Sequence, residues 1–375
     1  MNNEKLNNSP LENPNQSDEK KRFAKLRQFV DRHHIAILLI CGAVLIFLGS
    51  SIVFLITHQS PSHDDQTNLT IKKKPQPTKK YYSPLTGLEV TDETTTKQAV
   101  TGVMIENSPE ARPQSGLKQA GVVYEAVAEG GITRFLASYQ GDKPNLIGPV
   151  RSLRMYYLGW ASAYQASIAH VGGSYNALSE VRNGNYRDID QWFNGGSYWR
   201  ASDRYAPHNV YTSGEKLNQL NNAKGYKTSE FSGFLRTDGK PSENLTATTV
   251  NINFSSALFN TSYTYSKDTN SYLRSLAGAP HNDRESGQIA PNIVIAMEVG
   301  LQRRNNLDHY EDVITTGSGK AYIFQNGTIT EATWSRESFT SPLKLIGADG
   351  KEVALNRGQT WISAFTPGRG SVSWQ

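Results

Sequence analysis

The sequence of 375 residues contains a single cysteine, Cys41, so no internal disulfide can stabilise the fold. Motifs typical of metal sites are also missing, because the chain has no HExxH, no CxxC and no pair of histidines at helical spacing. We therefore predict neither a metal site nor a cofactor. The net charge is only +5, which argues against a nucleic-acid-binding protein.

The longest uncharged stretch of the sequence is IAILLICGAVLIFLGSSIVFLI, residues 35–56. As a helix rising about 1.5 Å per residue, it would span the ~30 Å hydrocarbon core of a membrane. Residues 1–34 before it are basic, whereas THQSPSHDDQTN after it has no Lys or Arg. The positive-inside rule then makes residues 1–34 a cytoplasmic tail and places the C-terminal body outside the cell. We predict a single-pass protein held in the cytoplasmic membrane by residues 35–56.

A cleaved signal peptide is the competing interpretation of this stretch. The apolar run is longer than a typical signal-peptide core, and no clear small-x-small cleavage site follows it. Cys41 also lacks the small preceding residues of a lipobox, because Leu39 and Ile40 stand there. We therefore favour an uncleaved helix, followed by an extracellular linker over residues 57–82, which contain Pro, Ser and Lys and no core pattern.

The rest of the chain predicts an α+β protein with two blocks. In residues 83–240, the runs GVVYEAVA and ITRFLASYQ are separated only by EGG, which predicts a tight hairpin, and helical patterns follow. This block is predicted to be a mixed α/β domain. In residues 245–375, Asn326-Gly327 and Asp349-Gly350 each lie between strand-like runs. This second block is predicted to be a mostly antiparallel β domain.

Three helices are predicted in the first block from apolar spacing and capping residues. SLRMYYLGWASAYQA has Ser152 as a candidate N-cap. YNALSEVRNG is expected to end at Gly184. The third helix is expected to begin at a capping box of Thr212 with Glu215 and to close at Gly225.

Charged residues gather near the first hairpin and near the first of these helices. Glu129 and Arg134 flank the double glycine of EGG and could pair across the turn. In GPVRSLR, Arg151 and Arg154 are three residues apart and would share a face at a helix start. Two guanidinium groups near a helix N-terminus suit a phosphate or a carboxylate. The alternative is that acidic residues neutralise these arginines inside the domain: Glu125, Glu129 or Asp190.

Further polar residues complete the candidate site. Glu106 and Arg112 lie in the loop MIENSPEARPQSGL, where they could form a pair. Ser174 and His208 are a possible nucleophile and base, but GGSYN is not the G-x-S-x-G elbow, and a serine after two glycines is more often a helix N-cap. The hypothesised ligand-binding set comprises Glu106, Arg112, Glu129, Arg134, Arg151, Arg154, His170, Ser174, His208 and Asn209.

Several long motifs occur in an order that resembles a known family. MIENSPEARPQSGLKQAGVVYEAVAEGGITRFLASY, IGPVRSLRMYYL, AHVGGS and APHNVY are similar to the YerB-like family of bacterial envelope proteins, and GSGKAYIFQNGTITEATW and GQTWI are similar to that family's C-terminal domain. The resemblance covers about residues 83–365. It implies a Gram-positive protein held at the membrane, exposed outside and linked to penicillin-binding proteins. Such proteins are typically lipoproteins, whereas this chain has no lipobox.

The family has no established activity, so the resemblance supplies no catalytic residues. It favours a non-catalytic accessory or scaffold protein of cell-envelope (peptidoglycan) assembly, with penicillin-binding proteins or a cell-wall polymer as partners. One alternative is an enzyme that clamps an anionic envelope substrate with Arg134, Arg151 and Arg154 and uses His208 or Glu129 as general acid and base. The other is a module that binds such a ligand without chemistry. Convergence of these side chains on one accessible pocket would favour the alternatives.

Overall fold

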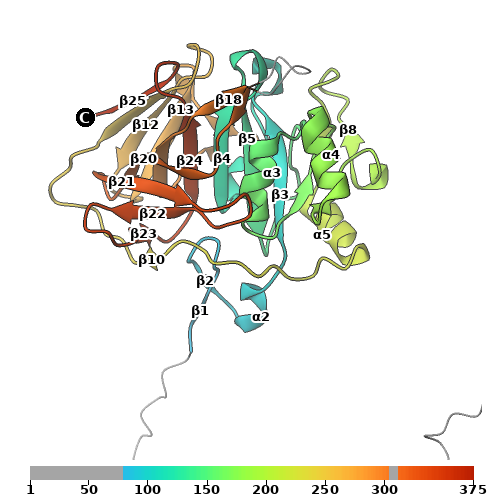
Figure 1. Cartoon of the computed structure of the whole chain (residues 1–375), viewed down its shortest axis with the longest axis horizontal. Helices are drawn as coiled ribbons and strands as arrows, with labels where there is room; N and C mark the ends of the chain where they lie inside the picture. The colour runs from blue at the N-terminus through green and yellow to red at the C-terminus, as the bar shows by residue number, and fades with distance from the viewer. Residues whose placement is uncertain (1–78, 304–310) are drawn as a thin grey trace, which may run out of the picture. The chain divides into compact units, whose positions relative to one another are not determined.

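The computed structural model describes residues 79–303 and 311–375 (Figure 1). Residues 35–56, predicted to be the anchor, lie outside the described residues, as do the predicted tail and nearly all of the linker. Within the described ranges, no helix is both long and apolar enough to cross a membrane. Strands greatly outnumber helices there, so the described part of the chain is a largely β fold.

The main element is a sheet of ten strands that draws on both sequence blocks. From one edge to the other, its strands are β22 (Lys344–Gly347), β21 (Thr328–Arg336), β20 (Gly317–Gln325), β17 (Ile293–Glu298), β24 (Thr360–Phe365), β4 (Val122–Val127), β5 (Thr133–Gln140), β3 (Val100–Glu106), β6 (Ser167–Ala169) and β7 (Arg187–Asp188). The predicted hairpins at EGG and at Asn326-Gly327 are confirmed as the β4–β5 and β20–β21 turns.

Strand β24 lies in the middle of this sheet, between β17 of its own block and β4 of the first block. It runs parallel to both neighbours, with Trp361 opposite Val294 on one side and Val123 on the other. All six of its residues are buried, as expected for a strand covered on both faces. The prediction of a mostly antiparallel second block therefore misses its parallel centre, although β20, β21 and β22 do pair antiparallel.

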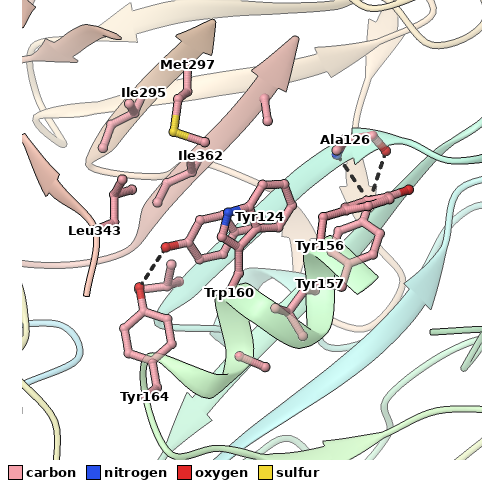
Figure 2. Close-up of a cluster of buried hydrophobic side chains, with 14 of the residues drawn as sticks. Tyr124, Ala126, Tyr156, Tyr157, Trp160, Tyr164, Ile295, Met297, Leu343 and Ile362 are labelled. Carbon is pink, nitrogen blue, oxygen red and sulfur yellow. Dashed lines mark hydrogen bonds between the residues drawn. The ribbon is translucent and has the colours of Figure 1, made fainter. Parts of the chain in front are cut away.

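The two faces of the ten-stranded sheet carry separate cores, because successive residues of a strand point to opposite sides. On one face, Tyr124 of β4 stacks on Trp160 at 4.8 Å between ring centroids and hydrogen-bonds the hydroxyl of Tyr164 at 3.0 Å (Figure 2). Tyr157 lies on the same helix as Trp160, and its hydroxyl donates to the Ala126 carbonyl and accepts from the Ala126 N–H. This face is covered by α3 (Met155–Ser162) and α4 (Tyr175–Asn183) (Figure 1).

The other face packs against a second, antiparallel sheet. Its strands, in spatial order, are β14 (Ala279–Pro280), β13 (Ser271–Leu276), β12 (Thr261–Ser266), β11 (Thr249–Asn253) and β25 (Ser371–Trp374). Val250 and Tyr263 from this sheet join Val123 and Trp361 in the second core. In TTVNINFS, Val250, Ile252 and Phe254 alternate with more exposed residues and are all buried, as the period of two along a strand requires.

Short elements complete the described fold. They are α2 (Glu93–Thr96), α5 (Gly214–Ala223) and the pairs β1 (Tyr81–Tyr82) with β2 (Glu89–Val90), β8 (Trp199–Arg200) with β9 (Val210–Tyr211), β10 (Arg236–Thr237) with β23 (Leu355–Asn356), β15 (Asn282–Asp283) with β16 (Gly287–Gln288), and β18 (Leu301–Arg303) with β19 (Glu311–Val313).

The predicted helix boundaries are only partly right. Gly184 follows α4 as its C-cap, as predicted, and Ser174 caps its start by accepting from the Ala177 backbone N–H. The predicted cap Ser152 is wrong, because α3 begins later, after Arg154. The predicted capping box is displaced by one residue, since Ser213 rather than Thr212 caps α5. Both helices begin later than predicted because the residues before them hydrogen-bond other segments: Leu153 N–H donates to the Gly172 carbonyl and Thr212 N–H to the Ile147 carbonyl.

A buried polar network joins the two sequence blocks. Arg274 of β13 donates to Glu125 of β4 at 2.9 Å, and both side chains are completely buried. The Trp361 indole also donates to Glu125, at 3.0 Å. Arg274 Nε donates to His281 Nδ1 at 2.9 Å, which leaves His281 Nε2–H to donate to Gln114 Oε1 at 2.9 Å. The blocks 83–240 and 245–375 thus share a sheet and an ion pair, and the division of the chain into two domains stays a prediction.

Candidate functional site

Most of the predicted site residues lie at one edge of the ten-stranded sheet. Strands β4, β24, β17, β3, β6 and β7 all point the same way, because each is parallel to a neighbour or separated from it by the antiparallel β5. Their carboxyl ends therefore meet at this edge, which we call the carboxyl edge. Ligand sites in sheets with parallel strands are typically built there. Glu106, Glu129 and His170 each end or follow one of these strands.

One charged cluster surrounds Glu129 at the tip of the β4–β5 hairpin. Arg134 Nη2 lies 3.4 Å from Glu129 Oε2, which confirms the pair predicted across the turn. Arg154 Nε pairs with the other carboxylate oxygen, Oε1. Burial alone would raise the pKa of Glu129, but the hydrogen bond from Arg154 and the charges of both arginines outweigh it and lower the pKa. Glu129 is thus an ionised carboxylate facing two guanidinium groups.

A second cluster surrounds Glu106 at the end of β3. His208 Nδ1 lies 3.0 Å from Glu106 Oε1, and Arg151 Nε lies 3.3 Å from the same oxygen. Ser108 Oγ contacts both Glu106 Oε1, at 3.1 Å, and His208 Nδ1, at 3.2 Å. A serine-histidine-acid relay uses the two ring nitrogens separately. Because serine and acid share one nitrogen here, the cluster does not form such a relay.

Arg151 and Arg154 therefore bind different glutamates instead of one common ligand face. The expected helical spacing does not apply to them, because both precede the first residue of α3. The predicted pair between Glu106 and Arg112 is also wrong. Arg112 donates instead to the side chain and carbonyl of Asn107 and to the carbonyl of Leu258.

The remaining predicted residues have structural partners. His170 is fully buried, with Nδ1 2.8 Å from the Gly172 carbonyl and Nε2 3.1 Å from Asp188 Oδ1. Ser174 caps α4, and Asn209 donates to the carbonyls of Ala201 and Arg204. Among the described residues, His170, Asp188 and Asp190 are a group whose ligand-type atoms lie within 4.8 Å of one another. Asp190 is already bound by Arg182 at 3.2 Å and by the Phe193 backbone N–H.

Two cavities lie near these clusters, and each is bordered by different residues of the predicted set. The larger, of about 570 Å³, is bordered by Glu129, Arg154 and Ser174. The other, of about 490 Å³, is bordered by Arg112 and His208. Residues of the second block also border the larger cavity, among them Glu311 and Arg369, and the sequence did not predict them as site residues. The sequence carries no signal for this position, because only the parallel pairing of β24 with β4 brings Ala364, Thr366 and Arg369 to the cavity that Glu129 borders.

The comparisons with known proteins agree with this architecture. Residues 85–227 match the family described as "Protein of unknown function (DUF3048) N-terminal domain", and residues 250–362 match the corresponding C-terminal domain. A curated relative, "Putative lipoprotein YerB" of Bacillus subtilis, is 34% identical over 297 residues, which cover 77% of this chain and 87% of the relative. The crystal structure of YerB protein from Bacillus subtilis matches with a TM-score of 0.69 and 31% identity, over 78% of this chain and 99% of that chain. Two matched domains, a relative of this similarity and a matching crystal structure together show that this chain belongs to the YerB-like (DUF3048) family.

Proposed function

We propose that this protein is a non-catalytic accessory or scaffold protein of Gram-positive cell-envelope (peptidoglycan) assembly. The observation that carries the non-catalytic part is the pairing of the predicted catalytic groups with one another. Glu129 is bound by Arg134 and Arg154, and His208 is bound through Nδ1 by Glu106. Ser174, the candidate nucleophile, caps a helix. A general acid or base needs to reach a reacting atom, and these groups instead reach one another.

The envelope part of the proposal rests on family membership and on the sequence before the described residues. The Bacillus subtilis relative is named as a putative lipoprotein, which supports a position at the membrane facing outward. In this proposal residues 35–56 anchor the chain as a single span, with residues 1–34 in the cytoplasm. Penicillin-binding proteins or a cell-wall polymer are the proposed partners of the extracellular body.

The experiment is complementation of a deletion strain, scored by incorporation of a fluorescent D-amino acid into the wall. Wild type, His208→Ala, Glu129→Gln and the surface control Lys267→Ala are expressed to equal levels, and their folding is checked by thermal melts. A scaffold predicts that every folded variant restores incorporation. Loss of complementation by a folded His208→Ala or Glu129→Gln would instead support an enzyme or a ligand-binding site. Unchanged incorporation in the deletion strain would refute the envelope role itself.

Partner binding is tested separately in membranes. Cross-linking the tagged chain in living cells, followed by labelling with a fluorescent penicillin, is expected to reveal penicillin-binding proteins in the captured material. A tagged chain lacking residues 83–375 is the matched control for capture through the membrane segment alone. Equal capture by that control would contradict a partner site in the extracellular body.

A ligand-binding module is the second candidate function, and it is compatible with a scaffold. It is favoured by one observation, the cavity of about 570 Å³ bordered by Arg154 and Glu129. Its size falls within the range of about 300–1,000 Å³ that is typical of small-molecule sites.

A further inference from the structure

The cavity of about 490 Å³ that His208 borders is built from three segments far apart in the sequence. They are residues 110–113 after β3, residues 203–208 between β8 and β9, and Arg284 between β15 and β16. An ion pair of 2.6 Å between Asp203 and Arg284 ties the last two segments together. This cavity shares no lining residue with the larger one, so it is a separate site.

Two arginines of this cavity are held by neutral acceptors. Arg204 donates through Nη1 to the Glu110 carbonyl at 2.9 Å and through Nη2 to the Pro113 carbonyl at 2.7 Å, which joins two of the three segments. Arg112 donates through Nε to Asn107 Oδ1 at 3.1 Å and through Nη2 to the Asn107 carbonyl at 2.9 Å. Because none of these acceptors is a carboxylate, they fix both guanidinium groups in place without neutralising their charge.

Three polar atoms of this cavity are left for a ligand. Among the described residues, Arg112 Nη1 and Arg204 Nε make no hydrogen bond. His208 Nδ1 is engaged by Glu106 Oε1 at 3.0 Å, so Nε2 is the ring nitrogen that remains. In a neutral ring Nε2 accepts from a hydroxyl group, and in an imidazolium it donates to an anionic oxygen.

The charges that border the cavity have a positive surplus. Three arginines and two acidic residues border it: Arg112, Arg204, Arg284, Glu110 and Asp203. Asp203 is already bound by Arg284, which also lies 3.7 Å from Glu285 outside the lining, and Glu110 is exposed to water. Burial lowers the pKa of Arg112, because its charge has lost part of its solvation. A bound anion would compensate for that loss.

The arrangement of the donors favours a phosphate over a carboxylate. A carboxylate is planar and is bound best by the two parallel donors of one guanidinium group. Here the donors belong to three side chains, Arg112, Arg204 and His208, on two separate segments. The oxygens of a phosphate point in several directions and can accept from all three, and its larger negative charge also suits a cationic lining.

The ligand extends beyond its phosphate, because the cavity has neighbours on both sides. One neighbour, of about 380 Å³, shares Arg112 and Pro113 with it. The other, of about 330 Å³, shares Asp203 and Arg284 with it. Apart from Pro113, every residue that lines the central cavity is polar. The rest of the ligand therefore needs hydrogen-bonding groups of its own, as the hydroxyl groups of a polyol provide.

We propose that this cavity binds the phosphate group of a polyol phosphate, with phosphate oxygens at Arg112, Arg204 and His208. The site is additional to the scaffold role and to the larger cavity considered above. Two sources share this chemistry. One is a free polyol phosphate, which is a monoester, and the other is a chain of polyols linked through phosphodiesters.

The test is calorimetric titration of the full-length chain, purified in detergent without phosphate buffer. Glycerol 3-phosphate is the monoester probe, and poly(glycerol phosphate) is the diester probe at equal phosphate concentration. Glycerol lacks the phosphate, and glycerate carries a carboxylate in its place. Glycerol 3-phosphate is expected to bind about tenfold or more tightly than glycerate, and glycerol is expected not to bind.

Variants of the chain test the assigned donors. Arg112→Gln and Arg204→Gln are each expected to lower the affinity for glycerol 3-phosphate by about tenfold or more, because each removes a charge-assisted bond. His208→Ala is expected to lower it by about fivefold, as for one ordinary hydrogen bond. Arg303→Gln is the matched control, because Arg303 is 86% exposed and lies outside the lining. The control is expected to stay within about twofold of wild type.

Tighter binding of the polymer would identify phosphodiester chains as the source, and tighter binding of the monoester would identify free polyol phosphates. The proposal is overturned if neither phosphate probe binds at millimolar concentration, or if glycerate binds as tightly as glycerol 3-phosphate. It is overturned equally if folded Arg112→Gln and Arg204→Gln keep the affinity of wild type. The comparison of ligands stays decisive where a variant fails to fold. Failure here would leave the complementation test of the scaffold role intact.

Discussion

Breaking the buried ion pair between Glu125 and Arg274 is expected to destabilise both sequence blocks together. Both side chains are completely buried at a separation of 2.9 Å. In Glu125→Gln, Arg274 keeps its charge without a counter-charge, and an amide replaces a carboxylate that also accepts from Trp361 and from Thr133. Removing one partner of a buried pair costs about 3–5 kcal/mol. We expect that loss in the free energy of unfolding for Glu125→Gln.

The reciprocal variant, Arg274→Met, is expected to cost less and to depend on pH. Burial already raises the pKa of Glu125 while Arg274 opposes the rise, so without Arg274 the pKa rises further. The carboxyl group can then become neutral in the folded state by binding a proton, whereas a buried guanidinium keeps its charge. A raised folded pKa gives stability that is present at low pH and lost as pH rises through it. The penalty of Arg274→Met should therefore grow between pH 5 and pH 8, by at most about 1.4 kcal/mol per pH unit.

Urea unfolding, followed by tryptophan fluorescence at both pH values, measures these losses. The double variant Glu125→Gln/Arg274→Met completes the cycle, and it is expected to be more stable than Glu125→Gln alone, because no unpaired charge remains. A single transition with unchanged slope is expected, since the pair joins β4 to β13. A loss below about 1 kcal/mol for Glu125→Gln, or two separated transitions, would refute the reasoning.

Three further predictions follow from buried or clustered charges. Burial, followed by the charges of nearby arginines, lowers the pKa of His281 well below its usual range. Because the unfolded chain binds a proton at His281 more readily than the folded chain, stability should fall as pH drops below about 6.5. Differential scanning calorimetry should show that His281→Gln loses this pH dependence. Arg336 donates to four backbone carbonyls, one of them that of Gly159 in α3; Arg336→Lys should cost about 1–3 kcal/mol for each buried carbonyl left without a donor, measured by urea unfolding. Arg154→Ala is expected to lower the melting temperature more than Arg151→Ala, because its side chain is 13% exposed against 26%; equal shifts would contradict this ranking.

Local chemistry explains the parts of the fold that the sequence predicted well. Asn326 has a φ of 59° and Gly327 a φ of 74°, the left-handed conformations that a two-residue hairpin turn requires. Gly184 ends α4, and Ser174 caps its start through its own side chain. Each of these features depends on residues within a few positions of one another, so sequence patterns are sufficient to find them.

Pairings between distant segments explain what the sequence did not predict. TWISAF reads as a strand, but nothing within it specifies parallel neighbours from both blocks. Helix α3 begins at Met155, later than predicted, because the residues before it hydrogen-bond other segments. Leu153 N–H donates to the Gly172 carbonyl, and Arg151 N–H donates to the Met104 carbonyl. These constraints arise only when the sheet is assembled.

The candidate site shows the same division. The positions of charged residues at strand ends were apparent from the sequence, and Glu129 with Arg134 paired as expected. The partners of Glu106 were not apparent from the sequence, because its side chain contacts Arg151 and His208 rather than Arg112, which is closer along the chain. Closeness in sequence favoured Arg112 as the partner of Glu106, whereas the folded chain brings Arg151 to it at the carboxyl edge.

The central position of β24 has a consequence for the order in which the molecule is built. A chain emerges from the ribosome with its N-terminal residues first, so β4, which ends at Val127, is made long before β24, which begins at Thr360. Until then β4 and β17 each present an unpaired edge that other chains can add to. Synthesis therefore passes through an interval of aggregation risk, which ends only when this one strand is inserted.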